Sequence, residues 1–177
     1  MKKTIAICLM LIAVMSMQAQ STVKLKDIPK VIIGQWTTTE SNNGNPLDLI
    51  FDFKKQGSLD IKMVGHVNSP ELGYIEFLVF LNAKYSIEDT EISYILNRNS
   101  FQMKFGKIKW NAAVKEQFRK NPGMEAEIKK AMMAEMMKEK ETFINMCGEM
   151  KSMTIENMTR SSLTLSDDDG ARIYTRK

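Results

Sequence analysis

The chain contains little cysteine and almost no histidine. Its 177 residues include two cysteines, Cys8 and Cys147, and a single histidine, His66. One histidine excludes a histidine-based metal cluster and a histidine-dependent catalytic triad within one chain. Because Cys8 falls in an apolar N-terminal run, only Cys147 remains for the folded part, and no intramolecular disulfide is expected. We interpret Cys147 as a small buried residue; pairing between chains and soft-metal binding are the alternatives.

Long hydrophobic runs are also scarce. The one clear run, residues 4–17, follows Lys2 and Lys3 and ends before small and polar residues around Ala19 and Gln20. This order predicts a signal peptide over residues 1–20. The run is shorter than the roughly 20 residues of a membrane-spanning helix, and a retained anchor is the alternative. We therefore predict an exported protein, periplasmic or secreted. No cysteine stands at the cleavage site, so a lipid anchor is not expected. Residues 21–177 are predicted to form one domain.

Concentrated charge of one sign is absent. The formal net charge is +4, and lysines and arginines are scattered without a basic block interleaved with aromatic residues. A nucleic-acid partner is therefore not predicted. The sequence holds neither a phosphate-binding glycine loop nor a haem attachment motif. No two carboxylates are placed convincingly for acid–base catalysis. These absences predict a protein that is not an enzyme and carries no cofactor and no resident metal.

Alternation of apolar and polar residues runs through most of the chain. A first strand begins at Gly34, and the large ring of Trp36 is expected to close the bottom of a barrel. Further strand-like segments follow at residues 47–54, 59–63, 73–87, 91–96, 101–110, 150–158, 162–166 and 171–176. Turn signals separate them, among them Asn43-Gly44 and residues 97–100 and 167–170. About nine strand-like pieces suit one closed antiparallel barrel, which makes the predicted fold mainly β.

One region breaks the β pattern. Asn111 is a suitable N-cap for a short helix ending at Lys120, and residues 121–123 form a break. Strong helix formers then fill residues 125–147, with Gly148 as the stop. We therefore predict a helical insertion over residues 111–148. Its apolar stripe comprises Met124, Ile128, Met132, Met136, Phe143 and Cys147, flanked by Met133, Met137 and Ile144 and interrupted by the polar residues 138–141.

Methionines in this insertion allow more than one interpretation. Met132, Met133, Met136 and Met137 stand at i, i+1, i+4 and i+5, with Met146 and Met150 nearby. Thioethers are soft ligands, so Cu(I) binding is chemically possible. Methionine is also an adaptable packing residue, which favours a helix that covers a barrel mouth or docks on a partner chain. The run at residues 74–80, apolar on both faces, is a second candidate docking surface.

The sequence resembles the lipocalin and calycin superfamily, especially small exported lipocalin-like proteins of Bacteroidetes-type bacteria. The resemblance rests on Gly34-x-Trp36, the meander of short strands, and the terminal segments at residues 153–165 and 172–176. It covers roughly residues 31–110 and 150–176. It implies an up-and-down antiparallel barrel in which Trp36 packs against a basic side chain near the C-terminus, either Arg172 or Arg176. Gly34, Trp36 and Arg176 are accordingly expected to be structural.

The end of the chain is also similar to fatty-acid-binding proteins, in which an Arg-x-Tyr pair on the last strand holds a carboxylate. Arg172 and Tyr174 face the same way on a strand. The resemblance implies that they hold an anionic head group, whereas an Arg172 that stacks on Trp36 or faces water is the alternative.

Together, these features predict a barrel that binds a small apolar or amphipathic ligand, with the methionine-rich helix as a lid. The predicted ligand-binding residues are Phe51, Phe53, Leu59, Ile61, Tyr85, Phe101, Met103, Phe105, Arg172 and Tyr174. The same residues would be ordinary core if the barrel is filled. The competing hypothesis is an interaction or homodimerisation module that uses the methionine-rich helix. Residues 167–169 are interpreted as a solvated hairpin turn rather than a calcium loop.

Overall fold

The computed structural model describes residues 22–42 and 45–177. Its strands are β1 (Gly34–Asn42), β2 (Asn45–Phe53), β3 (Ser58–Ser69), β4 (Gly73–Glu88), β5 (Glu91–Trp110), β6 (Met150–Met158), β7 (Ser162–Asp167) and β8 (Gly170–Arg176). Its helical segments are η1 (Leu25–Asp27), α2 (Ile28–Val31), η2 (Lys55–Gly57), α3 (Ala112–Lys120), α4 (Met124–Met136), η3 (Met137–Glu139) and α5 (Lys140–Cys147). The predicted signal peptide and the Asn43-Gly44 turn lie outside the described residues.

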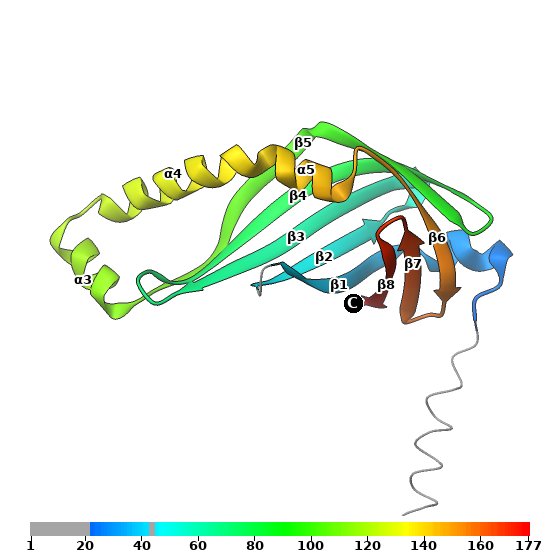
Figure 1. Ribbon diagram of the computed structural model, residues 1–177, viewed down its shortest axis with the longest axis horizontal. Helices are drawn as coiled ribbons and strands as arrows, with labels where there is room; N and C mark the ends of the chain where they lie inside the picture. The colour runs from blue at the N-terminus through cyan, green and yellow to red at the C-terminus, as the bar shows by residue number, and fades with distance from the viewer. Residues whose placement is uncertain (1–21, 43–44) are drawn as a thin grey trace, which may run out of the picture.

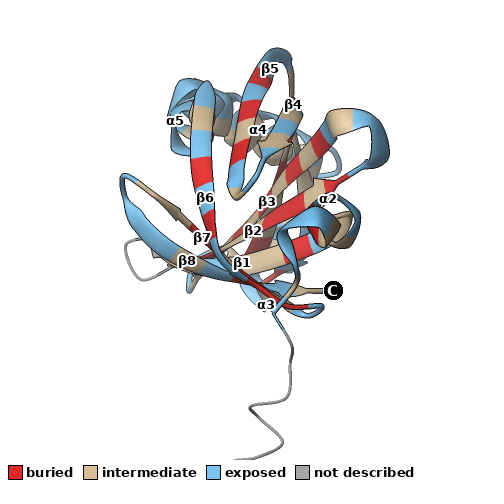
Figure 2. Ribbon diagram, turned by 90° about the vertical axis from the view of Figure 1, so that its right-hand side faces the viewer, coloured by how far each residue is buried: buried red, intermediate tan, exposed pale blue. Residues whose placement is uncertain are grey.

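The strands form a closed antiparallel barrel in sequence order, and the helical insertion lies between β5 and β6 (Figure 1). Each strand pairs with the next, and β8 returns to β1 through Trp36↔Arg176 and Thr37↔Thr175. The predicted fold class is therefore confirmed. The alternation that predicted it is visible in burial, because β3 reads as alternating buried and partly exposed residues from Leu59 to Gly65 (Figure 2).

One end of the barrel is closed by the N-terminal segment. Ile28 and Ile32, in and after α2, are buried in the core together with Trp36. The Trp36 indole donates a hydrogen bond to the Ile32 carbonyl at 2.6 Å. The Arg176 guanidinium lies over the indole, 4.7 Å from the ring centroid. The expected contact between Trp36 and a C-terminal basic residue is thus present, and the residue is Arg176.

The barrel is lopsided, because β3, β4 and β5 are much longer than the last three strands (Figure 1). β6 pairs with β5 only between Glu91 and Ile95. Beyond that point the three long strands continue as an extended sheet. The helical insertion runs back along this extension and brings α5 over the barrel (Figure 1).

Residues 97–100 were predicted as a turn between two strands, and this prediction is wrong. Both flanking segments pair with β4 in the same direction, through Asn82↔Asn97 and Phe80↔Gln102, so the extra residues form a bulge within one strand. Ser100 replaces the missing ladder bonds: its hydroxyl accepts from the Asn82 amide at 2.8 Å and donates to the Asn97 carbonyl at 2.6 Å. Local turn chemistry stabilises the bulge, while long-range pairing with β4 prevents a reversal.

The insertion begins and ends as its capping residues predict. The Asn111 side chain accepts from the Val114 amide at the start of α3. Gly148, with a φ of 73° that favours glycine, follows α5. The polar interruption at residues 138–141 coincides with a short 3₁₀ segment, η3, between α4 and α5. In the described part of the chain, no helix combines the length and apolar character needed to cross a membrane.

The two main helices of the insertion are held differently. Ile144 and Cys147 of α5 are buried in the barrel core, and the Phe143 ring contacts the Phe77 ring edge-on at 6.0 Å. Gly65 makes room for Phe77, since a Cβ at Gly65 would lie 2.1 Å from that ring. By contrast, α4 has no buried residue, and its methionines are only partly covered.

Candidate functional site

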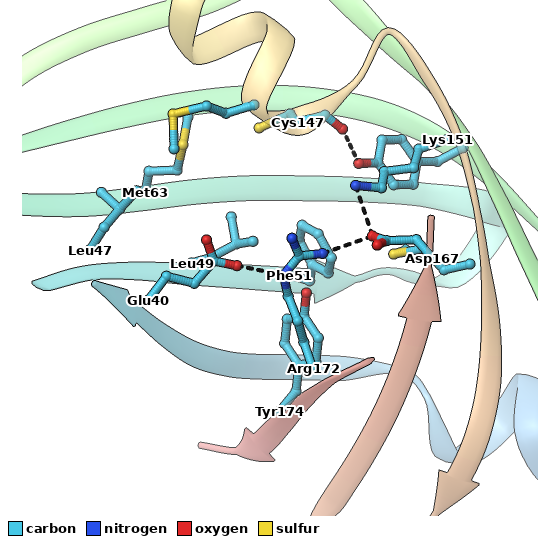
Figure 3. A pocket seen from close by; sticks show the side chains of 13 residues that line it. Glu40, Leu47, Leu49, Phe51, Met63, Cys147, Lys151, Asp167, Arg172 and Tyr174 are labelled. Carbon is cyan, nitrogen blue, oxygen red and sulfur yellow. Dashed lines mark hydrogen bonds and ion pairs between the residues drawn. The ribbon is translucent and has the colours of Figure 1, made fainter. Parts of the chain in front are cut away.

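A small cavity lies at the end of the barrel opposite α2. Its volume is about 40 Å³, and its lining comes from β1, β2, β3, β5, β6, β7, β8 and α5. Along β8, Arg176 lies at the closed end, whereas Arg172 lines the cavity. The C-terminal turn of α5, which ends at Cys147, forms the roof (Figure 3), and Met146 also lines the cavity. The cavity is therefore enclosed by the barrel mouth and its helical cover.

About half of the cavity wall is apolar. Leu47, Leu49, Met63 and Met153 line it from β2, β3 and β6. Three aromatic rings separate it from the closed end: Phe51 stacks on Tyr174 at 5.4 Å and meets Tyr94 edge-on at 6.2 Å. These inward positions follow from the two-residue period of the strands.

An ionic cluster forms the polar side of the cavity. Arg172 places Nε 2.7 Å from Glu40 Oε1 and a terminal nitrogen 2.8 Å from Asp167 Oδ2. Lys151 Nζ lies 2.8 Å from the same Asp167 oxygen (Figure 3). The backbone pairing of β1 with β8 extends only over Trp36 and Thr37. Nearer the mouth, the ion pair between Glu40 and Arg172 joins the two strands instead.

Asp167 corrects the prediction of a fully solvated acidic turn. Asp167 and Gly170 do pair across the β7–β8 hairpin, but only 5% of the Asp167 side chain is exposed. Burial by itself raises the pKa of Asp167, yet the hydrogen bond from Lys151 and the nearby charges of Lys151 and Arg172 hold that pKa below its usual value. The carboxylate faces inward because it continues the phase of Leu163 and Leu165 on β7.

Two further polar groups line the cavity without charge. Burial raises the pKa of the Cys147 thiol to about 12, so this thiol is protonated at neutral pH. Tyr174 is 1% exposed, and burial raises the pKa of its phenol well above the usual value. Among the described residues its hydroxyl has no hydrogen-bond partner. The Tyr174 hydroxyl is not among the fully buried polar atoms, and in the described part of the chain no group bonds to it, so it is available to the cavity.

The roof is fastened to the barrel at two places. The Tyr94 hydroxyl donates to the Cys147 carbonyl, which fixes the end of α5 over the barrel interior. Arg98, within the β5 bulge, pairs with Glu141 of α5 and with Glu149, the latter at 2.7 Å. The bulge therefore directs a basic side chain to the cover. The Arg98 pairs are exposed to solvent and contribute little stability.

The structure brings together three of the predicted ligand-binding residues, Phe51, Arg172 and Tyr174, around the cavity. Phe53, Leu59 and Ile61 instead fill the packed core and do not line it. Tyr85 packs edge-on against Phe53, and its hydroxyl donates to the Lys54 carbonyl. The remaining three residues lie on β5 past its pairing with β6: Phe101, Met103 and Phe105.

Sequence reasoning missed the charged half of the site. Glu40, Lys151 and Asp167 stand at strand ends and share the inward phase of buried neighbours: Glu40 with Trp36, Lys151 with Met153, and Asp167 with Leu165. A charged residue on the buried phase at a strand end is a usable signal, because such positions gather at the mouth of a barrel. The other lining residues absent from the predicted set are Leu47, Leu49, Met63, Tyr94, Met146, Cys147 and Met153.

The described residues contain no group of three or more His, Cys, Asp and Glu side chains placed to hold a metal ion. Copper binding by methionines is a separate hypothesis, which stays a prediction. Met132, Met133 and Met136 are partly buried, whereas Met137 is 41% exposed.

Comparisons with known proteins concern the fold. No family model matches the chain, and a search of curated proteins gives no match. Among solved structures, the chain is similar to a lipocalin-like protein from Bacteroides uniformis, with 17% identity, a TM-score of 0.41, and coverage of 83% of this chain and 99% of that one. It is also similar to an uncharacterized protein from Bacteroides eggerthii, with 14% identity, a TM-score of 0.38, and coverage of 82% and 98%. The eight-stranded up-and-down ring with its helical insertion is lipocalin-like in architecture.

Proposed function

We propose that the protein binds a small, partly apolar molecule at the barrel mouth beneath α5, as a carrier or binding protein rather than an enzyme. One observation carries this proposal: the cavity combines apolar side chains with the Tyr174 hydroxyl, which has no hydrogen-bond partner among the described residues. Ligand sites in proteins likewise combine apolar side chains with placed polar groups.

The cavity is much smaller than most ligand sites in proteins. At about 40 Å³, it has room for little more than water-sized groups, whereas ligand sites usually measure about 300–1,000 Å³. Binding of a ligand of the usual size therefore requires α5 to move outward. The connections of α5 suit such a movement, since η3 precedes the helix and Gly148 follows it.

Binding of an uncharged apolar fluorophore tests this proposal. N-phenyl-1-naphthylamine is expected to bind saturably, with a rise in fluorescence. Leu49→Trp, which fills the cavity, should abolish this binding, whereas Leu25→Trp provides a matched control at an exposed site 56% accessible to solvent. Equal binding by wild type and Leu49→Trp would place the fluorophore elsewhere and refute the proposed site. Native mass spectrometry of protein purified from its host then identifies any natural ligand.

We also propose that the protein is exported, with residues 1–20 removed as a signal peptide. The order of charged, apolar and small residues supports this proposal. N-terminal sequencing of the protein from its host is expected to find a start near Ser21. A start at Met1 would refute export by this signal.

A second candidate function is docking of another chain. It rests on a different surface from the apolar stripe of the helical insertion. Ile95 and Met150 lie directly opposite each other on the outer face of β5 and β6, and they are 60% and 75% exposed. They line an open groove of about 350 Å³. If this face is an interface, Ile95→Lys should shift a dimer to monomer in analytical ultracentrifugation, whereas Met137→Lys on the helix should not.

A further inference from the structure

The cations of the cavity are already neutralised by the protein itself. Arg172 contacts Glu40 and Asp167 at 2.7 and 2.8 Å, and Lys151 contacts Asp167 at 2.8 Å. The third nitrogen of the Arg172 guanidinium lies 3.8 Å from Asp169. Neither basic side chain is therefore left without a carboxylate. An arginine that is already paired with carboxylates differs from an unpaired arginine that can bind an anionic ligand.

The charges of the cluster also balance. Its partly buried members are two carboxylates, Glu40 and Asp167, and two cations, Lys151 and Arg172, whose side chains are 5–36% exposed. The third acid, Asp169, is 68% exposed and lies at the rim in water. A ligand carboxylate would find no unpaired cation and would stand beside two like charges in a poorly solvated site. A ligand ammonium would have to compete with Arg172 and Lys151 for the same two carboxylates.

The Tyr174 hydroxyl is the neutral group in the cavity that lacks a hydrogen-bond partner among the described residues. The Tyr174 hydroxyl lies within the ring of lining residues close to Arg172 (Figure 3). It can both donate and accept a hydrogen bond. The adjacent thiol of Cys147 is protonated and also uncharged. An alcohol or carbonyl oxygen satisfies Tyr174 without disturbing the ion pairs, and the rest of such a ligand can lie along Leu49, Met63 and Met153.

We propose that this site selects an apolar molecule with an uncharged hydroxyl or carbonyl head, and that it discriminates against fatty acids and other amphipathic anions. This inference rests on the proposed function and names its ligand class. It replaces the expectation that Arg172 and Tyr174 together hold a carboxylate. Glu40 and Asp167 occupy the place that such a carboxylate would take.

A matched series of ligands tests the inference. Decan-1-ol, decanoate and decylamine share one chain length and differ in the head group. Each compound is titrated near neutral pH into protein that holds bound N-phenyl-1-naphthylamine. The concentration of each compound stays below the one at which that compound aggregates. Decan-1-ol is expected to displace the fluorophore at a concentration at least about tenfold lower than either charged analogue, because only the charged heads need new ionic partners. Equal or tighter binding of decanoate or decylamine would overturn the inference.

Two variants sharpen this test. Tyr174→Phe should weaken the binding of decan-1-ol by about five- to tenfold, which is the usual effect on affinity of losing one neutral hydrogen bond. Glu40→Gln removes one carboxylate from Arg172 and should raise the affinity for decanoate relative to decan-1-ol by about tenfold or more. Near-UV circular dichroism establishes that both variants are folded. An unchanged decanoate to decan-1-ol ratio in folded Glu40→Gln would contradict the proposed role of the ion pair.

The two proposals fail in different ways. If the fluorophore does not bind, or binds equally well to Leu49→Trp, the proposed binding site is wrong and the head-group inference falls with it. If the fluorophore binds in the cavity but the three heads displace it equally, only the head-group inference is wrong.

Discussion

Two arginines on the same face of β8 occupy opposite ends of the barrel and have different partners. Arg176 lies over Trp36 and donates to the carbonyls of Val31 and Ile33 at 2.5 and 2.6 Å. Arg172 pairs with the carboxylates of Glu40 and Asp167. Fixed backbone carbonyls and an indole make Arg176 part of the closed end. Ionisable side chains beside a cavity place Arg172 in the candidate site, so the two arginines differ in their surroundings.

The largest expected effect comes from removing the arginine of the closed end. Arg176→Ala leaves two carbonyls unsatisfied and exposes one face of the Trp36 ring. We expect a loss of about 3 kcal/mol in the free energy of unfolding, measured by urea denaturation. Arg176→Lys should lie between this variant and wild type, because lysine keeps the charge without the planar fork. A loss below about 0.5 kcal/mol for Arg176→Ala would show that the closed end does not depend on this contact.

Removing the arginine of the mouth should cost less. Arg172→Met keeps much of the volume, and Asp167 retains its ion pair with Lys151. We expect a loss of about 1–2 kcal/mol, because the partners of Arg172 are only partly shielded from water. In a Glu40→Gln background the same change should cost less, and a double-mutant cycle measures the difference. Strict additivity would show that Glu40 and Arg172 do not interact energetically.

Acid should loosen the mouth rather than the closed end. The pKa of Asp167 is lower in the folded protein than its usual value of 3.8, so its charge stabilises the fold above that value. The stabilisation is lost as the pH falls through the depressed folded pKa. Wild type should therefore lose more thermal stability below about pH 4 than Asp167→Asn does. Parallel curves for the two proteins would contradict this assignment, because all other acids are shared.

Two buried tyrosines should give the smallest effects and the clearest contrast. Tyr94 donates to the Cys147 carbonyl, whereas Tyr174 has no hydrogen-bond partner in the described part of the chain. Tyr94→Phe should cost about 1 kcal/mol, while Tyr174→Phe should change stability by less than about 0.5 kcal/mol. Both values follow from thermal unfolding monitored by circular dichroism. A larger loss in Tyr174→Phe than in Tyr94→Phe would show that the Tyr174 hydroxyl is satisfied by the protein and is not reserved for a ligand.

The sequence predicted much of the fold but only three of the residues that line the cavity, Phe51, Arg172 and Tyr174. Alternation located the inward faces, including Phe51 and Tyr174, because one face of each strand must be buried. It failed at residues 97–100, where a local turn signal is overruled by pairing with β4. The turn interpretation also failed at Asp167, since a run of three acids before a glycine resembles a solvated turn, although Asp167 continues the inward phase of Leu163 and Leu165. Only the neighbouring strands place Lys151 and Arg172 close enough to stabilise a buried carboxylate.

The sequence by itself determined the phases of the strands and the limits of the helical insertion, since periodicity and capping depend on residues close together in the chain. Asn111 and Gly148 mark those limits through local backbone chemistry. The tertiary structure decided which arginine covers Trp36, which acids neutralise the other one, and how little space remains beneath α5. These features depend on side chains brought together from opposite ends of the chain, because ring closure places β8 against β1.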